Sequence, residues 1–352
     1  MAYTTINDPS AYFHTQLYTG DGSSNNAITN DANSGNFKPD WLWTKSRSYL
    51  DLHMVFDSSR GRDKRIFPNL NNAEADSSPD NFLKSFDTDG FTIGNDPGLN
   101  TNGGTLVAWQ WKANGGTTAT NNDGSHTSTV QANTTAGFSI VTYTGTGSGF
   151  TLGHGLGAAP EIIFNKGLSD SHSWIVGCTH DSANLSKVLV LNSSDASATA
   201  TANFNAAPTS SVYTIGTAGG VNNNGQNYVS YLFRSVQGYS KIGVYTGNGN
   251  ANGPFVYTGF KPAWVMFKDT SASAYWAIYD NKRDSFNPSD QVLAPNVSDA
   301  EDGSYNDIDL LSNGFKIRAS GSPNNTSSRT YIYMAFAENP FTTSDGVPTT
   351  AR

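Results

Sequence analysis

The sequence predicts an all-β protein made of three tandem antiparallel β-sandwich modules of about 100 residues each. A Tyr-Thr-Gly-x-Gly turn motif occurs three times, beginning at Tyr18, Tyr143 and Tyr245. Downstream of each copy come a proline, an apolar run and, six positions after the proline, a lysine: Pro39 and Lys45, Pro160 and Lys166, Pro262 and Lys268. The period is too long for a solenoid unit, which spans about 20–50 residues. No amphipathic helix longer than a few turns is evident, although 71–83 could hold a short one.

The composition also favours β-structure. Hydrophobic residues make up 36% of the 352 residues, and the 35 glycines add to the material available for a core. Charged residues make up only 14%, against about 25% in ordinary globular chains. Asn, Thr, Ser and Gly take their place, and these residues suit tight turns and neutral hydrogen-bonding surfaces better than long solvated helices.

The elements of each module follow one order. A short strand ends at the repeated tyrosine, in the segments 13–18, 138–143 and 240–245. The glycine-rich turn then leads to a short apolar run that predicts a buried strand, at 41–43, 162–164 and 264–267. Another strand begins eight positions after the lysine, at His53, Trp174 and Trp276. A turn followed by alternating residues predicts a hairpin at 89–93, 211–215 and 313–317, and a last strand closes each module at 106–111, 228–233 and 331–336.

These elements divide the chain into modules at 1–113, 138–236 and 237–341, with a C-terminal tail at 342–352. The segment 114–137 is rich in Gly, Thr and Asn and lacks apolar periodicity, so it is predicted to be a linker that leaves the first two modules mobile. Only a few residues join the second and third modules, which predicts close packing between them.

Charge and patterning exclude several classes of partner. The net charge is −8 and no basic block is present, so nucleic acid is not an expected partner. No apolar run approaches the roughly 18 residues of a membrane helix, so no membrane insertion is expected. The N-terminus shows no signal peptide. One cysteine, Cys178, excludes an internal disulfide framework.

The sequence predicts no catalytic, metal or cofactor site. His172, Cys178 and His180 are the nearest approach to a cluster, but Cys178 corresponds to an aspartate in both other modules and is expected to be a buried strand residue. Two acidic loops, 87–90 and 299–309, are weak calcium candidates and are expected to be ordinary surface turns. No glutamate recurs between modules, so the paired carboxylates of a glycosidase are not indicated.

Aromatic residues make up 12% of the chain, which invites a carbohydrate-binding interpretation. Most of the tryptophans fall on predicted strands and are expected in the core. Four tyrosines outside the repeat pattern are weak candidates for ligand contact: Tyr49, Tyr257, Tyr275 and Tyr305.

Several motifs resemble a family of tailed-phage virion structural proteins, tail-fibre-like repeat proteins common in phages of marine bacteria and cyanobacteria. The segments that carry the resemblance are 8–13, 17–20, 55–61, 85–91, 107–113 and 153–166. The resemblance extends to about Phe341 and implies no catalytic residues.

From the composition and the resemblance, we expect a non-enzymatic virion protein, made in the host cytoplasm, that forms an exposed tail- or fibre-associated appendage for host adsorption. Other virion proteins and further copies of the chain are the expected partners, and contact with host surface glycans is left open. One alternative is a decoration or cement protein of the capsid head. A less favoured alternative is a polysaccharide depolymerase.

Overall fold

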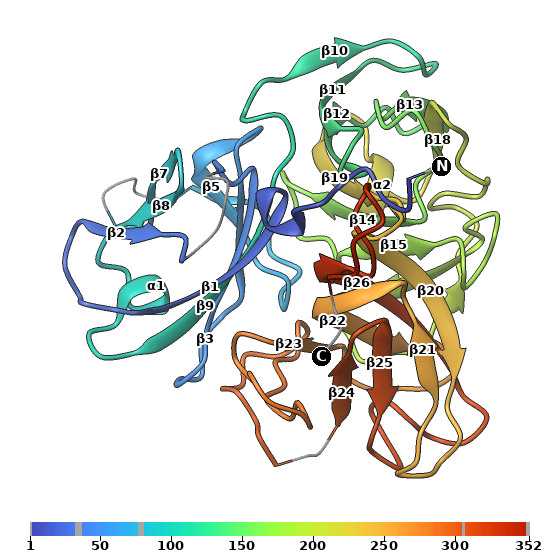
Figure 1. The fold of residues 1–352 in the computed structure, drawn as a ribbon. Coiled ribbons are helices and arrows are strands. Elements are labelled where there is room, and N and C mark those ends of the chain that lie inside the picture. The colour runs from blue at the N-terminus through green and yellow to red at the C-terminus, as the bar shows by residue number, and fades with distance from the viewer. Residues whose placement is uncertain (1, 32–36, 77–80, 305–306, 350–352) are drawn as a thin grey trace.

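The computed structural model describes residues 2–31, 37–76, 81–304 and 307–349 (Figure 1). The predicted all-β class is confirmed, because 42% of the chain is strand and 3% is helix, and the strands pair in several antiparallel sheets. No described helix is long and apolar enough to cross a membrane.

The first repeat forms a six-stranded sheet in the order β1-β9-β3-β4-β5-β6. Its strands are β1 (Phe13–Thr19), β9 (Thr105–Trp111), β3 (Trp41–Ser46), β4 (Met54–Asp57), β5 (Gly61–Ile66) and β6 (Ala75–Asp76). The small sheet consists of β2 (Asn26–Thr29), β8 (Gly90–Ile93) and β7 (Leu83–Asp87), and the helical turns are η1 (Pro9–Ala11) and α1 (Pro97–Asn100). The described part of 71–83 holds β6 and the start of β7, so the suggested helix there is wrong for these residues.

The second repeat contributes most of an eight-stranded sheet. Its strands in order are β10 (Ala119–Asn121), β11 (Ser128–Asn133), β12 (Phe138–Thr144), β19 (Asn227–Phe233), β14 (Ile162–Gly167), β15 (Ile175–Cys178), β16 (Lys187–Val190) and β17 (Ala198–Thr199). A two-stranded sheet pairs β13 (Phe150–Gly153) with β18 (Val212–Ile215), and α2 spans Gly219–Asn222.

The segment 114–137 differs from the predicted linker. It forms β10 and β11, and β11 pairs along its length with β12. Val130 of β11 is buried in the core of the second repeat. The strands form despite the lack of apolar alternation because the free edge of β12 offers hydrogen-bond partners that a local pattern does not reveal.

The third repeat forms a four-stranded sheet and a three-stranded sheet. The first contains β20 (Ser240–Thr246), β26 (Thr330–Pro340), β22 (Phe260–Asp269) and β23 (Ala277–Asp280), and the second contains β21 (Phe255–Tyr257), β25 (Gly314–Ile317) and β24 (Ile308–Leu311).

The three large sheets share one strand order. In each, the strand that ends at the repeated tyrosine lies beside the last strand of the repeat, which pairs in turn with the strand carrying the repeated lysine. These orders are β1-β9-β3-β4, β12-β19-β14-β15 and β20-β26-β22-β23. The repeated residues therefore occupy matching positions in the three sheets.

The sheets meet in one central core, in addition to the outer core of each repeat. The ring of Trp41 stacks on Tyr231 of the second repeat with centroids 4.8 Å apart. The rings of Trp111 and Trp264 of the third repeat have centroids 5.7 Å apart. The ring of Phe233 of the second repeat lies 5.9 Å, between centroids, from that of Phe336 of the third. The predicted mobility between the first two repeats is not seen, because they bury large aromatic side chains against each other.

Contacts between repeats form a closed ring. At equivalent positions, a backbone N–H of each repeat donates to a carbonyl of the next: Glu74 to Leu168 (2.8 Å), Ser197 to Thr270 (3.0 Å) and Glu301 to Arg47 (2.9 Å). The first repeat thus contacts the second, the second the third, and the third the first, as in a cyclic trimer. Figure 1 shows the first repeat in blue to teal at the left, the second in green and yellow at the upper right, and the third in orange and red below it.

A second ring of hydrogen bonds starts from the residues eight positions after each lysine. Trp174 Nε1 donates to the Phe67 carbonyl (2.9 Å), and Trp276 Nε1 donates to the Val190 carbonyl (3.0 Å). His53 Nε2 lies 3.1 Å from the carbonyl oxygen of Ala294. Because Trp43 Nε1 donates to His53 Nδ1, Nε2 carries the proton and donates to that carbonyl.

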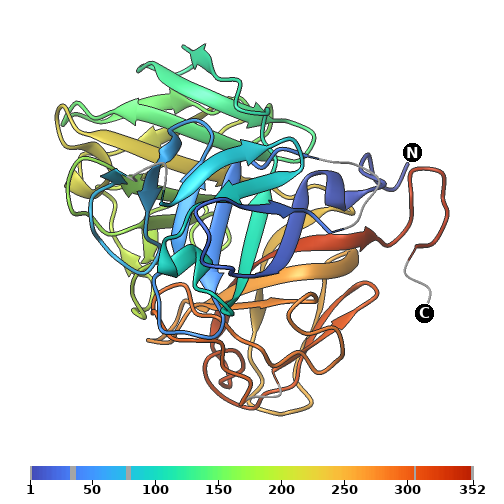
Figure 2. The same cartoon turned by 90° about the vertical axis from the view of Figure 1, so that its left-hand side faces the viewer.

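The two chain ends lie on the same side of the molecule in Figure 2, where the first repeat faces the viewer. Asn7 Nδ2 donates to Ser344 Oγ at 2.7 Å, and the Ser344 N–H donates back to Asn7 Oδ1 at 2.7 Å. The N-terminal arm therefore ties the first repeat to the end of the third.

Candidate functional site

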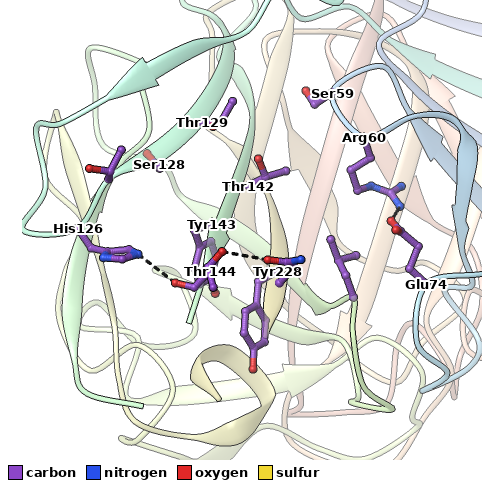
Figure 3. Close-up of a pocket in the computed structure, with 13 residues that line it drawn as sticks. Ser59, Arg60, Glu74, His126, Ser128, Thr129, Thr142, Tyr143, Thr144 and Tyr228 are labelled. Atoms are coloured by element: carbon purple, nitrogen blue, oxygen red, sulfur yellow. Dashed lines mark hydrogen bonds and ion pairs between the residues drawn. The ribbon is translucent and has the colours of Figure 1, made fainter. Parts of the chain in front are cut away.

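A cavity of about 540 Å³ opens at the junction of the first and second repeats (Figure 3). Hydroxyl-bearing side chains predominate in its lining. The first repeat contributes Ser59, Arg60 and Glu74, and the rest of the lining is His126, Thr127, Ser128, Thr129, Thr142, Tyr143, Thr144, Leu168, Asn227 and Tyr228.

Among the described residues of this lining Arg60 is the one arginine, and each of its three guanidinium nitrogens donates a hydrogen bond. It donates to Asp57 Oδ2, to Glu74 Oε2 and, at 3.3 Å, to the Tyr231 hydroxyl. Burial disfavours the charged form, but the nearby Asp57, Tyr231 and Glu74 outweigh burial and raise the pKa of Arg60 above its ordinary value. Arg60 is thus a structural cation that is not free to bind an anionic ligand.

The other titratable groups of the cavity do not converge. His126 Nε2 lies 3.0 Å from the Thr144 carbonyl oxygen, and the ring packs on Phe150 at 4.6 Å. In Figure 3, His126 and Glu74 occupy opposite sides of the cavity. This arrangement offers hydrogen bonds to a neutral polar ligand or partner, without a paired general acid and base.

Of the four predicted contact tyrosines, the three that the structure describes do not gather into one site. Tyr49, Tyr257 and Tyr275 are 42%, 57% and 54% exposed, as expected for surface residues. None of them lines the cavity of Figure 3. Tyr275 lines a different cavity, in the third repeat. Tyr305 lies outside the described residues.

The residues considered for a metal or nucleophile site are separated by their contacts. Cys178 is buried in the central core, and burial raises the pKa of its thiol to about 12. His180 Nε2 faces Glu161 at 3.5 Å, whereas His172 Nε2 lies 3.1 Å from the Asn223 amide nitrogen. Within the described ranges, no group of three or more His, Cys, Asp or Glu side chains could hold a metal ion.

The acidic loops considered for calcium are also engaged elsewhere. Asp87 accepts hydrogen bonds from Ser85 (2.5 Å) and Thr92 (2.7 Å). Glu301 forms ion pairs with Arg47 (2.7 Å) and Arg283 (2.9 Å), so its carboxylate joins the third repeat to the first.

The repeated lysines prove to be buried at the junctions, a role that the sequence did not reveal. Lys45, Lys166 and Lys268 have no exposed surface, and each ammonium donates to backbone carbonyls. Lys166 reaches the Asn71 carbonyl of the first repeat (3.3 Å), and Lys268 reaches the Ser194 carbonyl of the second (3.2 Å). Burial lowers the pKa to about 8 for Lys45, about 7 for Lys166 and about 8 for Lys268.

Two sets of repeated asparagines also went unrecognised. One set accepts the backbone N–H of the residue eight positions after the lysine: Asn69 from His53, Asn192 from Trp174 and Asn296 from Trp276. The other set is buried beneath the Tyr-Thr-Gly turns and accepts from their backbone: Asn100, Asn222 and Asn325. Each member of the second set stands five positions before the last strand of its repeat, a spacing that could have revealed it.

We call each buried asparagine and the turn that it holds an asparagine clamp, and the repeated tyrosine adds one more hydrogen bond to it. Its hydroxyl donates to the carbonyl of the residue before the buried asparagine: Tyr18 to Leu99 (3.0 Å), Tyr143 to Val221 (2.8 Å) and Tyr245 to Asn324 (2.7 Å). The most recognisable motif of the sequence is therefore a structural turn.

Comparison with known proteins identifies a family and no activity. No curated protein matches the chain. A family described as a domain of unknown function, DUF7483, matches residues 8–340, which is nearly the whole chain and includes all three repeats. The protein therefore belongs to the DUF7483 family.

Proposed function

We propose that this protein is a non-enzymatic structural protein of a phage virion, built from three β-sandwich modules that assemble into one block. The single observation that supports this most is the closed ring of contacts around a shared core. The side chains that recur between repeats form turns and junctions between repeats. Their roles are structural, as we expect of a protein that serves as a rigid building block.

In the first placement, the protein is an exposed appendage of the tail or fibre and contributes to host adsorption. The chain is poor in charge and rich in Asn, Thr and Ser, which suits weak contact with neutral surface glycans. Association of further copies is part of this proposal and is measurable by light scattering of the purified chain.

The second placement, decoration of the capsid head, gains support from the ring arrangement. A single chain that presents three similar sheets around one axis offers three similar faces to its surroundings. Such a body can engage three equivalent neighbours at a threefold position, because contact surfaces related by rotation match partners related by the same rotation.

Labelling the protein on intact particles, with an antibody or a fused tag visible by electron microscopy, tests the proposal. Label at the tail supports the first placement and label over the head supports the second. Absence of the protein from purified particles overturns the virion assignment.

Incubation with soluble capsular polysaccharide tests the enzymatic alternative separately. Retention of the polysaccharide without shortening supports an adhesin, and no retention favours head decoration. Shortening of the chains would establish a depolymerase.

A further inference from the structure

A cavity of about 300 Å³ in the third repeat has a lining unlike that of Figure 3. Its walls are mainly apolar, and Tyr275, which is 54% exposed, is among the residues that line it. Three carboxyl groups complete it: Asp299 and Asp302 are exposed, and Asp307 is only 1% exposed. No Lys, Arg or His is among the described residues that line it.

Asp307 is the feature that packing alone does not explain. Its Oδ2 accepts a hydrogen bond from the Tyr279 hydroxyl, but its buried Oδ1 has no hydrogen-bond partner. The Asn324 amide approaches this carboxyl without reaching hydrogen-bond geometry. A buried polar atom without a partner is destabilising, so its retention calls for an explanation.

The first repeat shows what this position holds when only packing matters. Ile308 pairs with Ile317 in the third repeat as Leu83 pairs with Ile93 in the first. Asp307 therefore corresponds to Phe82, an apolar residue packed against the outer core of the first repeat. The third repeat has an acid with a free oxygen in place of a core-packing aromatic ring.

These groups define the chemistry of a ligand. Carboxylates at pH 7 only accept hydrogen bonds, so the ligand must present O–H or N–H donors. The ring of Tyr275 and the apolar wall favour a flat ligand with an apolar face. A volume of about 300 Å³ lies at the lower limit of small-molecule sites and suits a single sugar ring.

From this lining we infer that the cavity is a saccharide subsite, which takes a neutral or amino sugar and rejects sugars that carry a carboxylate. The inference deepens, and rests on, the glycan contact within the proposed function. A lysine or arginine side chain of a partner is the competing occupant. It is less favoured because Asp299 and Asp302 are exposed, where charge attraction is weak, whereas the unpaired oxygen and the apolar wall lie inside.

Titration of the full chain with glucosamine, N-acetylglucosamine and galacturonic acid oligosaccharides, followed by NMR or calorimetry, tests this inference. We expect the first two to bind weakly and the acidic oligosaccharide not to bind. Tyr275→Ala should weaken binding about tenfold, the loss of about 1.4 kcal/mol expected of an aromatic contact. Tyr257→Ala, which removes an equally exposed tyrosine outside the cavity, is the matched control and should leave affinity unchanged.

Asp302→Asn provides a second variant at an exposed position that is not expected to disturb folding. It should weaken binding of glucosamine slightly more than that of N-acetylglucosamine, because only glucosamine carries a cationic amine and the attraction of an exposed carboxylate is small. The inference is overturned if no saccharide binds, if Tyr275→Ala has no effect, or if the acidic oligosaccharide binds equally well. Binding of a lysine-rich peptide with the same dependence on Tyr275, and no saccharide binding, would assign the cavity to a protein partner instead. Particle labelling decides the virion assignment independently of all these results.

Discussion

Tyr231 of the second repeat donates a hydrogen bond of 2.6 Å to the carboxylate of Asp57 in the first, and both side chains are buried. The same relationship recurs one junction further round the ring, where Trp109 Nε1 donates to Asp280 Oδ2 at 3.0 Å. Each aspartate also pairs with the arginine three positions later. A buried carboxylate is tolerated when it is paired and hydrogen-bonded, so these contacts hold the central core in one register.

Replacing Tyr231 by Phe should therefore destabilise the fold without altering its shape. The change removes one hydrogen bond to a buried charge, and we expect a loss of about 1.5–3 kcal/mol in the free energy of unfolding. The urea midpoint measures it. Tyr49→Phe, at an exposed tyrosine, is the control. Equal midpoints for Tyr231→Phe and the wild type would show that the bond contributes little to stability.

At the third junction of the ring, between the second and third repeats, two sulfur-containing side chains take the place of the polar pair. Cys178 occupies the position of Asp57 and Asp280, while Met334 occupies that of Tyr231, and both belong to the central core. The position of the pairing arginine holds Asp181 in the second repeat. The acid, its donor and its arginine are thus absent together, which avoids a buried unpaired charge.

Cys178→Asp alone should cost about 3–5 kcal/mol, because the new carboxylate would be buried without a cation. Adding Asp181→Arg and Met334→Tyr should recover part of this loss, as these changes recreate the contacts of the other two junctions. A cycle of unfolding measurements on the single and combined variants gives the coupling energy. Additive effects would contradict the equivalence of the three junctions.

Local patterns predicted strands far better than they predicted assembly. The apolar runs at Trp41 and Trp264 were expected to be buried strands, and they are. Nothing local indicated that these tryptophans face a core shared by three repeats, because contact partners distant in sequence leave no periodic signature. The strand β11 was missed for a similar reason: its pairing with β12 outweighs its weak local preference.

The sequence predicted only part of the cavity in the third repeat, and none of the cavity in Figure 3. Tyr275 was singled out because it falls outside the repeat pattern, and it is among the residues that line the cavity of the third repeat. Asp307 stood in an acidic loop that the sequence treats as solvated, and only the packing of β24 shows that its carboxyl is buried. Burial of an acid is a property of the folded neighbourhood, and composition does not encode it.

The asparagine clamp gives a prediction for the turn motif. Asn222 Oδ1 accepts from the N–H groups of Thr146 and Gly147, and its Nδ2 donates to the carbonyls of Ser148 and Gly216. Asn222→Ala should cost about 2–4 kcal/mol, because several backbone groups lose their partner at once. Thermal unfolding followed by circular dichroism measures the loss. Asn224→Ala, at an exposed neighbour, should change stability by less than about 0.5 kcal/mol. Equal effects of the two substitutions would remove the structural role assigned to Asn222.

Lys166 predicts how stability depends on pH. Burial, with a smaller contribution from the nearby Arg60, lowers its pKa from 10.5 to about 7 in the folded protein. Between pH 7 and about 10 the unfolded chain therefore binds more protons than the folded one, so stability rises with pH, by up to about 1.4 kcal/mol per unit for this lysine. Lys45 and Lys268 act in the same direction, since burial lowers the pKa of each to about 8.

Lys166→Met should reduce this slope and leave the part due to the other two lysines. Free energies of unfolding at pH 7 and pH 9 provide the comparison, a range chosen below the ionisation of tyrosines in the unfolded chain near pH 10. Lys187→Met removes an exposed lysine of β16 and should leave the slope as in the wild type. If Lys166→Met also left the slope unchanged, Lys166 of the wild-type protein would have to remain protonated between pH 7 and pH 9. In that case the carbonyl oxygens of Gly167 and His172, at 2.9 and 2.7 Å, stabilise its charge enough to offset burial.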